Sequence, residues 1–579
     1  MVNIKILPEG ISISTKTGTP LIDALNENGV LVNLPCGGDG RCGKCVVSIA
    51  PANGANNLPN EMMPDHEEKK HLSDESLKSG LRLACRVTVS RDIEVMVPLS
   101  SRVAGAGRSW EEFEVKDKDS LSGRDLYLAV DVGTTSIAVA IVDIVDIGAN
   151  DKTGGIIAHA SALNPQVTFG ADVISRINAV AIDEKNLKRQ QQLVLDTINE
   201  LVAKLTGKLG IDPKDIKGAT FAGNPTMEHL LLGINPISIS QAPFTPAFTG
   251  AVEKKAKDLG LNINPDGVAY VFPVFSGYVG GDTLAFIWSS RIHESKDIIL
   301  GIDIGTNGEI VLGNIDRLIC CSAAAGPAFE GSQIRDGMRA DFGAIEGVVI
   351  NGDDIELAVK GDGTGGNNET PIGICGSGIF DAVDQLIKAK VIKESGRITK
   401  DDVSPVLAER IQRIDSIVEF TLYNGNGTTG GTQKTIGITQ KDIREVQLAK
   451  GAMRAGVEIL LGELGIQWDD IKTVLIAGAF GNFLKPESIV GVGLIPKEMK
   501  DKIKFVGDAA LTGAVEGVLD EKIDSYSSNI KSNNSINNRS TNISTKKGIE
   551  RLAETIDYVE LSSDKSFNDL FIKRLPFED

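Results

Sequence analysis

Apolar and polar residues alternate over short distances in the first 97 residues of the chain, a pattern that predicts short strands. The expected strands cover residues 2–6, 11–14, 46–49, 87–89 and 93–97, and one helix covers residues 21–28. Residues 98–125 are rich in Ser, Gly and charged side chains and show little periodicity, so we predict a linker. The chain therefore begins with a small domain at 1–97 that a linker joins to the rest.

From residue 126 onward, segments rich in β-branched residues alternate with helical segments that carry Lys and Glu, as is typical of α/β layering. We divide this region into a middle domain at 126–295 and a C-terminal domain at 296–579. Within the C-terminal domain, residues 525–547 are rich in Asn and Ser and have too few apolar side chains to offset the entropy of ordering. We therefore predict a disordered insertion there, followed by a helix and a strand at 558–561.

The α/β region contains an internal repeat. The segment Y-L-A-V-D-V-G-T-T-S-I-A-V-A-I-V-D begins at Tyr127, and I-L-G-I-D-I-G-T-N-G-E-I-V-L-G-N begins at Ile299. The corresponding Asp131 and Asp303 are 172 positions apart. The repeat predicts a duplicated fold with two similar lobes, in which Asp131 and Asp303 face each other across the cleft between the lobes.

The net charge of the chain argues against nucleic acid and anionic membranes as partners. There are 60 Lys and Arg residues against 78 Asp and Glu residues, a formal net charge of −18, so no basic stripe is available for nucleic acid or an anionic membrane. No apolar run reaches the roughly 18 residues that a membrane-spanning helix needs. The N-terminus also lacks the apolar stretch of a signal peptide. We therefore expect a cytoplasmic protein that binds neither nucleic acid nor membrane.

The cysteines suggest the first chemistry, because four of the seven lie within the first 85 residues. They follow the spacing C-x5-C-x2-C-x39-C, in P-C-G-G-D-G-R-C-G-K-C and L-A-C-R-V, and are Cys36, Cys42, Cys45 and Cys85. Four thiolates can bind a [2Fe–2S] cluster, and a Gly-rich loop lets backbone N–H groups approach the sulfur atoms and stabilise their negative charge. A structural zinc site is the alternative, but it usually arranges its ligands as two C-x2-C pairs, of which only one occurs here.

The two repeated turns suggest a second kind of site, one that binds phosphate groups. In each copy a strand ends in Asp, a Gly-Thr turn follows, and a second strand leaves. Such a turn can surround phosphate oxygens with N–H groups and hydroxyls, and its Asp can hold Mg²⁺ together with the phosphates. One turn is explained as well by ordinary hairpin chemistry, but two at this separation favour a nucleotide site. The expected site residues are Gly133, Thr134, Thr135, Gly305, Thr306, Asn307 and Gly308, with Asp131 and Asp303 as catalytic carboxylates.

Two further glycine motifs follow. The segment V-L-I-A-G-A-F-G-N-F-L places Gly478 and Gly481 after a buried strand, where the backbone can lie against an adenine or a ribose. The segment G-I-C-G-S-G-I-F-D-A begins a helix at Gly376 and Ser377, and a helix N-terminus can bind an anion. Along residues 126–520, the two Asp-Gly-Thr turns are followed by the turn at Gly478 and Gly481. This order resembles that of the superfamily of sugar kinases, Hsp70 and actin ATPases.

The other cysteines and the two N-terminal histidines are expected to be structural. Cys320, Cys321 and Cys375 lie in apolar segments and are predicted to be buried thiols that pack. His66 and His71 lie in D-H-E-E-K-K-H, which predicts a solvated helix face.

The whole combination resembles the reductive activators of corrinoid proteins, which serve methyltransferase and O-demethylase systems. The resemblance covers nearly the whole chain. It rests on C-G-G-D-G-R-C-G-K-C, L-Y-L-A-V-D-V-G-T-T-S, A-S-A-L-N-P-Q-V-T-F-G-A-D-V-I-S-R-I, F-A-G-N-P-T-M-E-H-L-L-L-G, L-G-I-D-I-G-T-N-G-E-I, A-G-A-F-G and Y-V-E-L-S. It implies a multidomain α+β and α/β protein, with an N-terminal β-grasp [2Fe–2S] ferredoxin-like domain, a linker and a two-lobed ATPase of the duplicated RNase H-like kind. The insertion at 525–547 departs from the family pattern without touching a site residue.

The resemblance also implies a function. These proteins use ATP, with Mg²⁺, to drive an electron from a [2Fe–2S] cluster to the cobalt of a partner's corrinoid, which converts Co(II) to Co(I). The implied partners are a corrinoid protein and an upstream low-potential electron donor, and a homodimer stays open. Two alternatives also stay open: an Hsp70-like or sugar-kinase-like ATPase with a redox-sensing ferredoxin domain, and an electron-transferring activator of a different enzyme.

Overall fold

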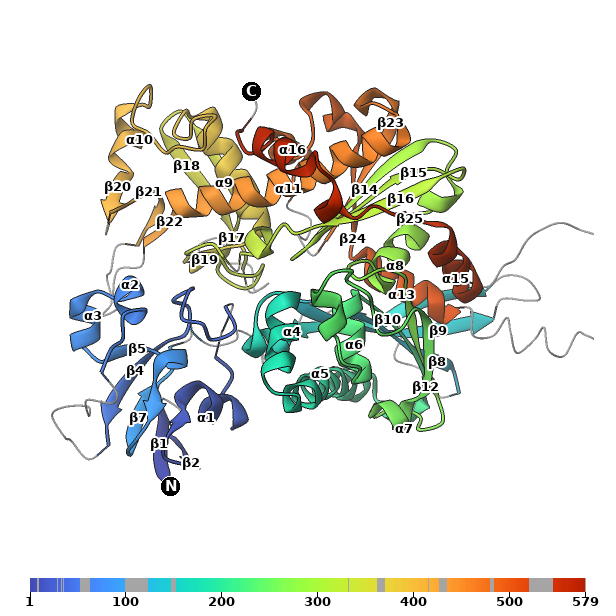
Figure 1. Ribbon diagram of the computed structural model, residues 1–579, viewed down its shortest axis with the longest axis horizontal. Helices are drawn as coiled ribbons and strands as arrows, with labels where there is room; N and C mark the ends of the chain where they lie inside the picture. The colour runs from blue at the N-terminus through green and yellow to red at the C-terminus, as the bar shows by residue number, and fades with distance from the viewer. Residues whose placement is uncertain are drawn as a thin grey trace, which may run out of the picture. The chain divides into compact units, whose positions relative to one another are not determined.

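The computed structural model describes the chain except for residues 8–9, 29, 33, 35, 53–62, 99–100, 102–122, 147–151, 332, 362–369, 415, 426–434, 479–483, 520–544 and 578–579 (Figure 1). Most of the predicted linker lies outside the described residues. The chain forms two units. The first comprises Met1–Ala219, Thr226–Ala247 and Lys254–Ala269, and the second comprises Thr220–Pro225, Phe248–Glu253 and Tyr270–Asp579.

The N-terminal domain contains β1 (Val2–Leu7), β2 (Ile11–Thr15), β3 (Thr19–Pro20), α1 (Leu21–Glu27), β4 (Val46–Pro51), α2 (Glu68–His71), α3 (Asp74–Lys78), β5 (Leu81–Leu83), β6 (Thr88–Val89) and β7 (Ile93–Met96). Its main sheet has the order β2-β1-β7-β4-β5, with β1 antiparallel to β2 and parallel to β7. Val2, Ile4 and Ile6 of β1 are buried and alternate with exposed residues. The apolar side of α1 packs into the same core. This mixed sheet agrees with the predicted β-grasp domain.

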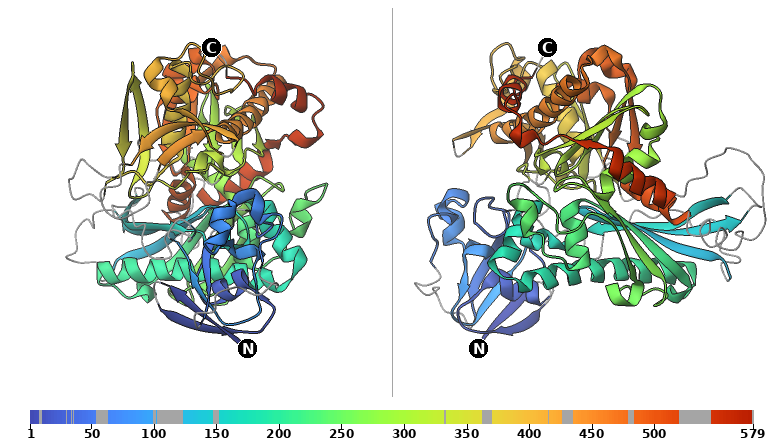
Figure 2. Two further views of the ribbon diagram at one scale, coloured as in Figure 1. Left: turned by 90° about the vertical axis from the view of Figure 1, so that its left-hand side faces the viewer. Right: turned by 45° about the vertical axis from the view of Figure 1, so that its right-hand side comes forward.

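The middle domain contains β8 (Asp125–Val132), β9 (Ser136–Asp146), β10 (Lys152–Leu163), α4 (Val173–Ile182), α5 (Lys185–Leu209), β11 (Ile216–Gly223), α6 (Pro225–Leu232), β12 (Gly250–Lys255), α7 (Ala256–Leu259), β13 (Val268–Val274) and α8 (Gly281–Ser289). The sheet order is β10-β9-β8-β11-β13-β12. Helix α5 packs against β9 and β10 (Figures 1 and 2). It does so because Val194, Ile198, Leu201 and Leu205 recur at helical spacing and are buried on one side.

The C-terminal domain contains β14 (Ile298–Ile304), β15 (Gly308–Gly313), β16 (Leu318–Ala323), β17 (Ala344–Asn351), β18 (Asp354–Val359), β19 (Gly373–Ile374), α9 (Gly376–Lys388), α10 (Pro405–Glu409), β20 (Ile411–Ile414), β21 (Ile417–Asn424), β22 (Thr435–Thr439), α11 (Gln440–Leu464), β23 (Ile471–Ala477), α12 (Pro486–Gly491), β24 (Ile503–Gly507), α13 (Ala509–Leu519), α15 (Thr545–Thr555), β25 (Asp557–Tyr558) and α16 (Phe567–Lys573). The main sheet has the order β24-β23-β14-β15-β16-β25. The sheets β18-β17-β19 and β20-β21-β22 are smaller.

The two main sheets repeat one topology. Strands β8, β9 and β10 form an antiparallel meander, as β14, β15 and β16 do. In each sheet, two later strands continue on the other side of the first strand: β11 and β13 beside β8, and β23 and β24 beside β14. The duplication predicted from the repeated sequence motif is therefore present in the fold.

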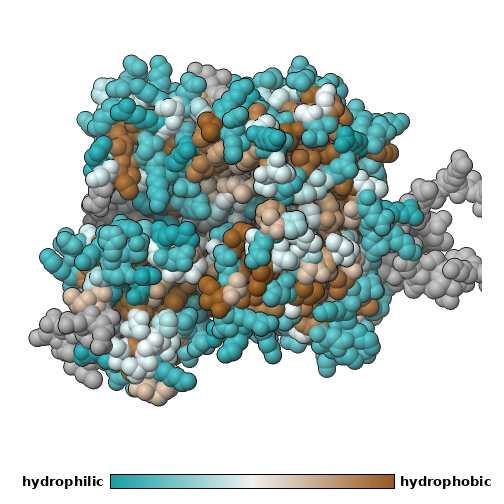
Figure 3. All heavy atoms as spheres, viewed as in Figure 1, coloured by the Kyte–Doolittle hydropathy of each residue, from teal (hydrophilic) through white to brown (hydrophobic). Residues whose placement is uncertain are grey.

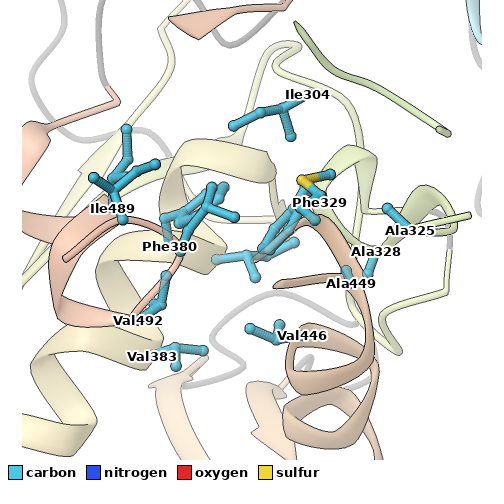
Figure 4. Packing of buried hydrophobic residues seen from close by; sticks show 14 of the residues in the cluster. Ile304, Ala325, Ala328, Phe329, Phe380, Val383, Val446, Ala449, Ile489 and Val492 are labelled. Carbon is cyan, nitrogen blue, oxygen red and sulfur yellow. The ribbon is translucent and has the colours of Figure 1, made fainter. Parts of the chain in front are cut away.

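The core of the C-terminal domain contains two stacked aromatic rings. Phe329 and Phe380 stack with their centroids 4.2 Å apart and their planes 13° apart. Figure 4 shows the aliphatic side chains around them, which include Val446 and Ala449 of α11 and Ile489 and Val492. Helix α11 begins at Gln440 because the side chains of Thr439 and Asp442 form a capping box.

The insertion predicted at 525–547 falls mainly on residues outside the described part of the chain, but its last three residues belong to α15. The predicted disorder is wrong for them. Ile549 and Leu552 of α15 are buried, and a Cβ atom at Gly548 would lie 2.0 Å from the ring of Trp288. The helix packs closely against α8, so the polar residues at 545–547 form the first turn of a packed helix. The strand that follows is shorter than predicted, and β25 pairs with β16.

Hydrophilic residues cover much of the face shown in Figure 3, with apolar residues in smaller patches between them. Among the described residues, no helix combines the length and the apolar character that crossing a bilayer requires.

Candidate functional site

The four N-terminal cysteines lie on two loops of the N-terminal domain. Cys36, Cys42 and Cys45 lie between α1 and β4, and Cys85 lies in a single 3₁₀ turn after β5. Four glycines of the longer loop, Gly37, Gly38, Gly40 and Gly43, have φ angles between 65° and 95°. Glycine adopts such positive φ angles at little energetic cost, so the loop can curl around the sulfur atoms. A Cβ atom at Gly43 would also lie 2.9 Å from Nδ1 of His71.

The four sulfur atoms form two pairs. Sγ of Cys45 donates a hydrogen bond to Sγ of Cys85 across 3.3 Å, and Cys36 is hydrogen-bonded to Cys42. The bond from Cys42, aided by backbone N–H groups of the same loop, lowers the pKa of Cys36 to about 5 although burial opposes it. The loop thus stabilises a thiolate, the form that binds metal.

Two pairs of cysteine sulfurs suit a [2Fe–2S] cluster, which has two irons and four protein sulfur ligands. A single zinc ion would need all four sulfurs to converge on one point. The arrangement of the four sulfurs in two pairs, one pair for each iron, fits the cluster.

A buried ion pair holds the strand that leads to Cys85. Nη2 of Arg82 donates to Oε2 of Glu68 across 2.6 Å, and the N–H of Leu83 donates to Oε1 of Glu68 across 2.9 Å. Both charged side chains are at most 2% exposed. The prediction of a solvated helix face at D-H-E-E-K-K-H is therefore wrong for Glu68, because its partner lies 14 residues away. It is correct for His66 and His71, which are exposed.

Replacing Glu68 by Gln is expected to lower the free energy of unfolding of the N-terminal domain by about 3–5 kcal/mol, because it leaves the Arg82 charge buried without its partner. Denaturant titration followed by the visible absorption of the cluster measures the loss. Glu67→Gln is the matched control, since Glu67 pairs with Lys70 at the surface and should change little. Equal midpoints for the two variants would contradict a structural role of the buried pair.

The first predicted phosphate turn joins β8 to β9 in the first unit. Asp131 lies at the end of β8, and Thr134 is buried while Thr135 is partly exposed. A Cβ atom at Gly133 would lie 2.6 Å from the carbonyl oxygen of Ser136, so the tight turn requires glycine there.

The second predicted phosphate turn joins β14 to β15 in the second unit. The N–H of Gly305 donates to the carbonyl oxygen of Asn307 across 3.0 Å. Oγ1 of Thr306 donates to Oε2 of Glu330 across 2.7 Å. A Cβ atom at Gly308 would lie 2.7 Å from the Met453 side chain, so glycine lets α11 pack here. The two turns belong to different units, and the opposition of Asp131 and Asp303 stays a prediction.

Asp303 is surrounded by other carboxyl groups of the second unit. Burial, with a smaller contribution from the charges of Asp282, Asp508 and Glu330, raises the pKa of Asp303 to about 7. Burial also raises the pKa of Asp282 to about 6. The same effect raises the pKa of buried Glu309 well above its usual value, with help from the Asp282 and Asp303 charges. Mg²⁺ keeps several waters and takes only one or two carboxylates directly, so Asp303 alone or with one neighbour could hold it.

Four of these carboxylates, those of Asp282, Asp508, Glu330 and Glu309, were missed by the sequence analysis. Asp282 lies in the first turn of α8, and the N–H of Thr283 donates to its Oδ1 across 2.6 Å. Asp508 precedes α13 and accepts from the N–H of Leu511 across 2.8 Å. Both follow glycine where a helix begins, in Y-V-G-G-D-T and F-V-G-D-A-A, and this shared pattern is the signal that could have found them. Glu330 has no comparable signal in the sequence.

The metal-free protein is expected to have a lower Tm at about pH 8 than at about pH 6, because a carboxyl pKa raised by folding stabilises the folded state only while the group is protonated. For Asp303 this contribution is lost as the pH rises through about 7. Calorimetry in the presence of EDTA measures the difference. Asp303→Asn should reduce it, and a difference that the variant leaves unchanged would rule out Asp303 as its source.

The remaining predicted nucleotide residues are partly described. Gly478 follows β23 with φ of 129°, and its N–H donates to the carbonyl oxygen of Gly507 across 3.1 Å. Gly481 lies outside the described residues. Gly376 and Ser377 begin α9 as predicted, but both are buried, so their contact with a nucleotide stays a prediction.

The thiols of Cys320, Cys321 and Cys375 are buried, as predicted. Burial raises the pKa of each of them, which keeps the group neutral. Sγ of Cys375 lies 3.4 Å from the carbonyl oxygen of Ile345.

Family models match three successive parts of the chain. The model of the 2Fe-2S iron-sulfur cluster binding domain matches residues 4–90, that of the RACo middle region matches 126–295, and that of the C-terminal domain of RACo, the ASKHA domain, matches 297–548. The chain is 36% identical over 395 residues to the corrinoid activation enzyme RamQ of Eubacterium limosum, a match that covers 67% of this chain and 63% of the relative. It is 25% identical over 437 residues to the [Co(II) methylated amine-specific corrinoid protein] reductase of Methanosarcina barkeri, a match that covers 68% of this chain and 70% of the relative.

A solved structure is also similar. The reductive activator for corrinoid, iron-sulfur protein is 29% identical, with a TM-score of 0.66, and the match covers 100% of this chain and 98% of that one. The chain thus spans less than two thirds of the Eubacterium limosum relative but nearly all of the solved structure.

Proposed function

The chain belongs to the RACo family of reductive activators of corrinoid proteins, and from this premise we propose that it performs an ATP-dependent reduction of a partner's corrinoid. One electron passes from an N-terminal [2Fe–2S] cluster to Co(II) of the partner, giving Co(I). The observation that supports this most is the presence, in one chain, of two pairs of thiols and a duplicated fold with a crowded set of carboxylates.

The N-terminal domain holds the electron carrier. When bound, a [2Fe–2S] cluster supplies a one-electron redox couple. Cys36 and Cys42 would hold one side of it, and Cys45 and Cys85 the other. The backbone N–H groups that face Cys36 stabilise negative charge on its sulfur, and the Arg82–Glu68 pair fixes the strand that presents Cys85.

The duplicated region binds the nucleotide. In our proposal Thr134, Thr135, Thr306 and Asn307 contact phosphate oxygens, and Gly478 and Gly481 border the nucleoside. Asp303 organises Mg²⁺ and the attacking water, and Asp131 does the same from the other copy of the repeat. Burial raises the pKa values of Asp303 and Asp282, and nearby carboxylate charges raise that of Asp303 as well, so in our proposal a Mg²⁺ ion that offsets these charges binds favourably here.

ATP is needed because Co(I) is a very strong reductant, so electron transfer from a ferredoxin-type cluster is uphill. A nucleotide can shift a two-state protein only by binding one state more tightly than the other. Closure of two lobes around a nucleotide is a common way to achieve this. Hydrolysis then returns the protein to its starting state, and an upstream low-potential donor returns an electron to the N-terminal domain.

The partner is a corrinoid protein. The printed names of two relatives concern corrinoid activation and a corrinoid protein reductase, and we extend that class of partner to this chain. We place both proteins, and the electron donor, in the cytoplasm.

Measuring ATP hydrolysis with and without a Co(II) corrinoid protein tests the proposed function. We expect the corrinoid protein to stimulate phosphate release and to be reduced when the N-terminal domain is supplied with electrons. A sugar-kinase-like enzyme would instead transfer phosphate to a small molecule and ignore the corrinoid protein, and that result would contradict the proposal.

A further inference from the structure

Residues 164–176 form most of the motif A-S-A-L-N-P-Q-V-T-F-G-A-D-V-I-S-R-I. The proposed function assigns no role to this segment. It runs from the end of β10 through a 3₁₀ turn at Pro165–Phe169 into α4. Its polar residues are unusually well buried, since Asn164, Gln166 and Arg176 are each 0% exposed. A buried guanidinium is costly unless its donors are satisfied, so the position of its partners is informative.

These side chains hold the first phosphate turn. Nδ2 of Asn164 donates to the carbonyl oxygen of Gly133 across 2.9 Å. Nη2 of Arg176 donates to the carbonyl oxygen of Thr134 across 2.6 Å. The backbone N–H of Asn164 donates to the carbonyl oxygen of Thr135 across 2.8 Å. Three successive carbonyl oxygens of the turn are therefore bonded to one segment.

Bonding the carbonyl oxygens in this way determines what the turn can present to a ligand. Carbonyl oxygens repel a phosphate, whereas backbone N–H groups and hydroxyls bind it. A turn whose carbonyls are all drawn toward the segment 164–176 cannot rotate a peptide unit to point an oxygen at the phosphate without breaking a hydrogen bond. The segment thus preorganises the turn for an anion.

Arg176 is fixed more firmly than a single contact would allow. Its Nε donates to the carbonyl oxygen of Gly170 across 3.0 Å, and its Nη1 donates to Oε1 of Gln166 across 3.1 Å. Its own carbonyl oxygen accepts from Nε2 of Gln190 across 3.0 Å. The planar guanidinium can make several bonds in fixed directions at once, which a lysine ammonium cannot reproduce.

We propose that Arg176 and Asn164 are positioning residues that fix the first phosphate turn in the conformation that binds the phosphates of ATP. This inference rests on the proposed ATP-binding function. Neither residue needs to touch the nucleotide, because each acts through a carbonyl oxygen of the turn.

The variant Arg176→Lys tests the inference in the full-length protein. It keeps the buried charge but loses the fork, so we expect the Kd for Mg·ATP to rise by about 10-fold or more, as for the loss of a hydrogen bond to a charged group. The Kd for adenosine should stay within about 2-fold, since adenosine has no phosphate for the turn to bind. A role in stability alone would weaken both ligands together.

Thr168→Val is the matched control. Thr168 is buried in the same segment, and its Oγ1 donates to the carbonyl oxygen of Pro165, within the segment. Its replacement should lower the Tm while leaving the Kd for Mg·ATP unchanged. Asn164→Ser provides a second test if Arg176→Lys does not fold, because it removes the bond to Gly133 while leaving an oxygen that can cap the 3₁₀ turn.

The outcomes separate this inference from the proposed function. If the unaltered protein binds Mg·ATP and a folded Arg176→Lys or Asn164→Ser variant binds it equally well, the positioning role is wrong. Equal losses of ATP and adenosine affinity would also overturn it in favour of a purely structural role. If the unaltered protein binds no ATP, the proposed function itself fails.

Discussion

Replacing Asp303 by Asn is expected to lower the rate of ATP hydrolysis by about 10²-fold or more, because it removes a charge that organises Mg²⁺ and the attacking water. The change preserves the size of the side chain, and the Asp303 carboxyl lies near the charges of Asp282, Asp508 and Glu330. Phosphate release with Mg·ATP measures the effect. The visible absorption of the cluster should be unaltered, since its four cysteines lie in the other unit.

Asp316→Asn is the control for this substitution. Asp316 is exposed between β15 and β16, in the same domain, and its replacement should leave hydrolysis at the normal rate. A normal rate for Asp303→Asn as well would place the catalytic carboxylate elsewhere.

Replacing Cys42 by Ala is expected to remove the [2Fe–2S] absorption and abolish electron transfer while leaving basal ATP hydrolysis largely intact. The substitution deletes one of the two sulfurs of the first pair, and Cys36 also loses the hydrogen bond that lowers its pKa. Cluster content is measured by absorption and iron analysis, and hydrolysis by phosphate release. Loss of ATP binding in a folded Cys42→Ala variant would contradict the separate roles of the two regions.

Cys320→Ala is the control for Cys42→Ala, because it removes a thiol that is not a proposed ligand of the cluster. Cys320 is fully buried in β16 and packs in the C-terminal domain. This variant should retain the full absorption of the cluster, so a loss of absorption equal to that of Cys42→Ala would show that the assay reports general damage.

The features that could be predicted from sequence are those whose signal is local. The glycine-rich cysteine loop is contained in ten residues, and each Asp-Gly-Thr turn directly follows the strand that positions it. The duplication was visible because Asp131 and Asp303 lie in two copies of one pattern. Such short segments largely determine their own conformation, and sequence reasoning found them for that reason.

The features that were missed depend on contacts between distant segments. Asp282 and Asp508 come close to Asp303 only through the packing of α8 and α13 beside the main sheet. Glu68 looked like a surface residue because it lies in α2, whereas its partner, Arg82, lies in strand β5, 14 residues further along the chain. The start of α15 was hidden by its polar composition, since its buried face begins only at Gly548.

The central claim is that ATP drives electron transfer to the corrinoid, and Co(I) formation on the partner tests it most directly. The chain, with its cluster reduced beforehand, is mixed with a Co(II) corrinoid protein, and Co(I) is followed by its absorption with and without Mg·ATP. We predict that the unaltered chain forms Co(I) only with ATP and that Asp303→Asn, with an equally reduced cluster, fails to sustain it. An Asp303→Asn variant that hydrolyses no ATP yet forms Co(I) at the normal rate would contradict ATP-coupled reduction and leave a ferredoxin joined to an unrelated ATPase.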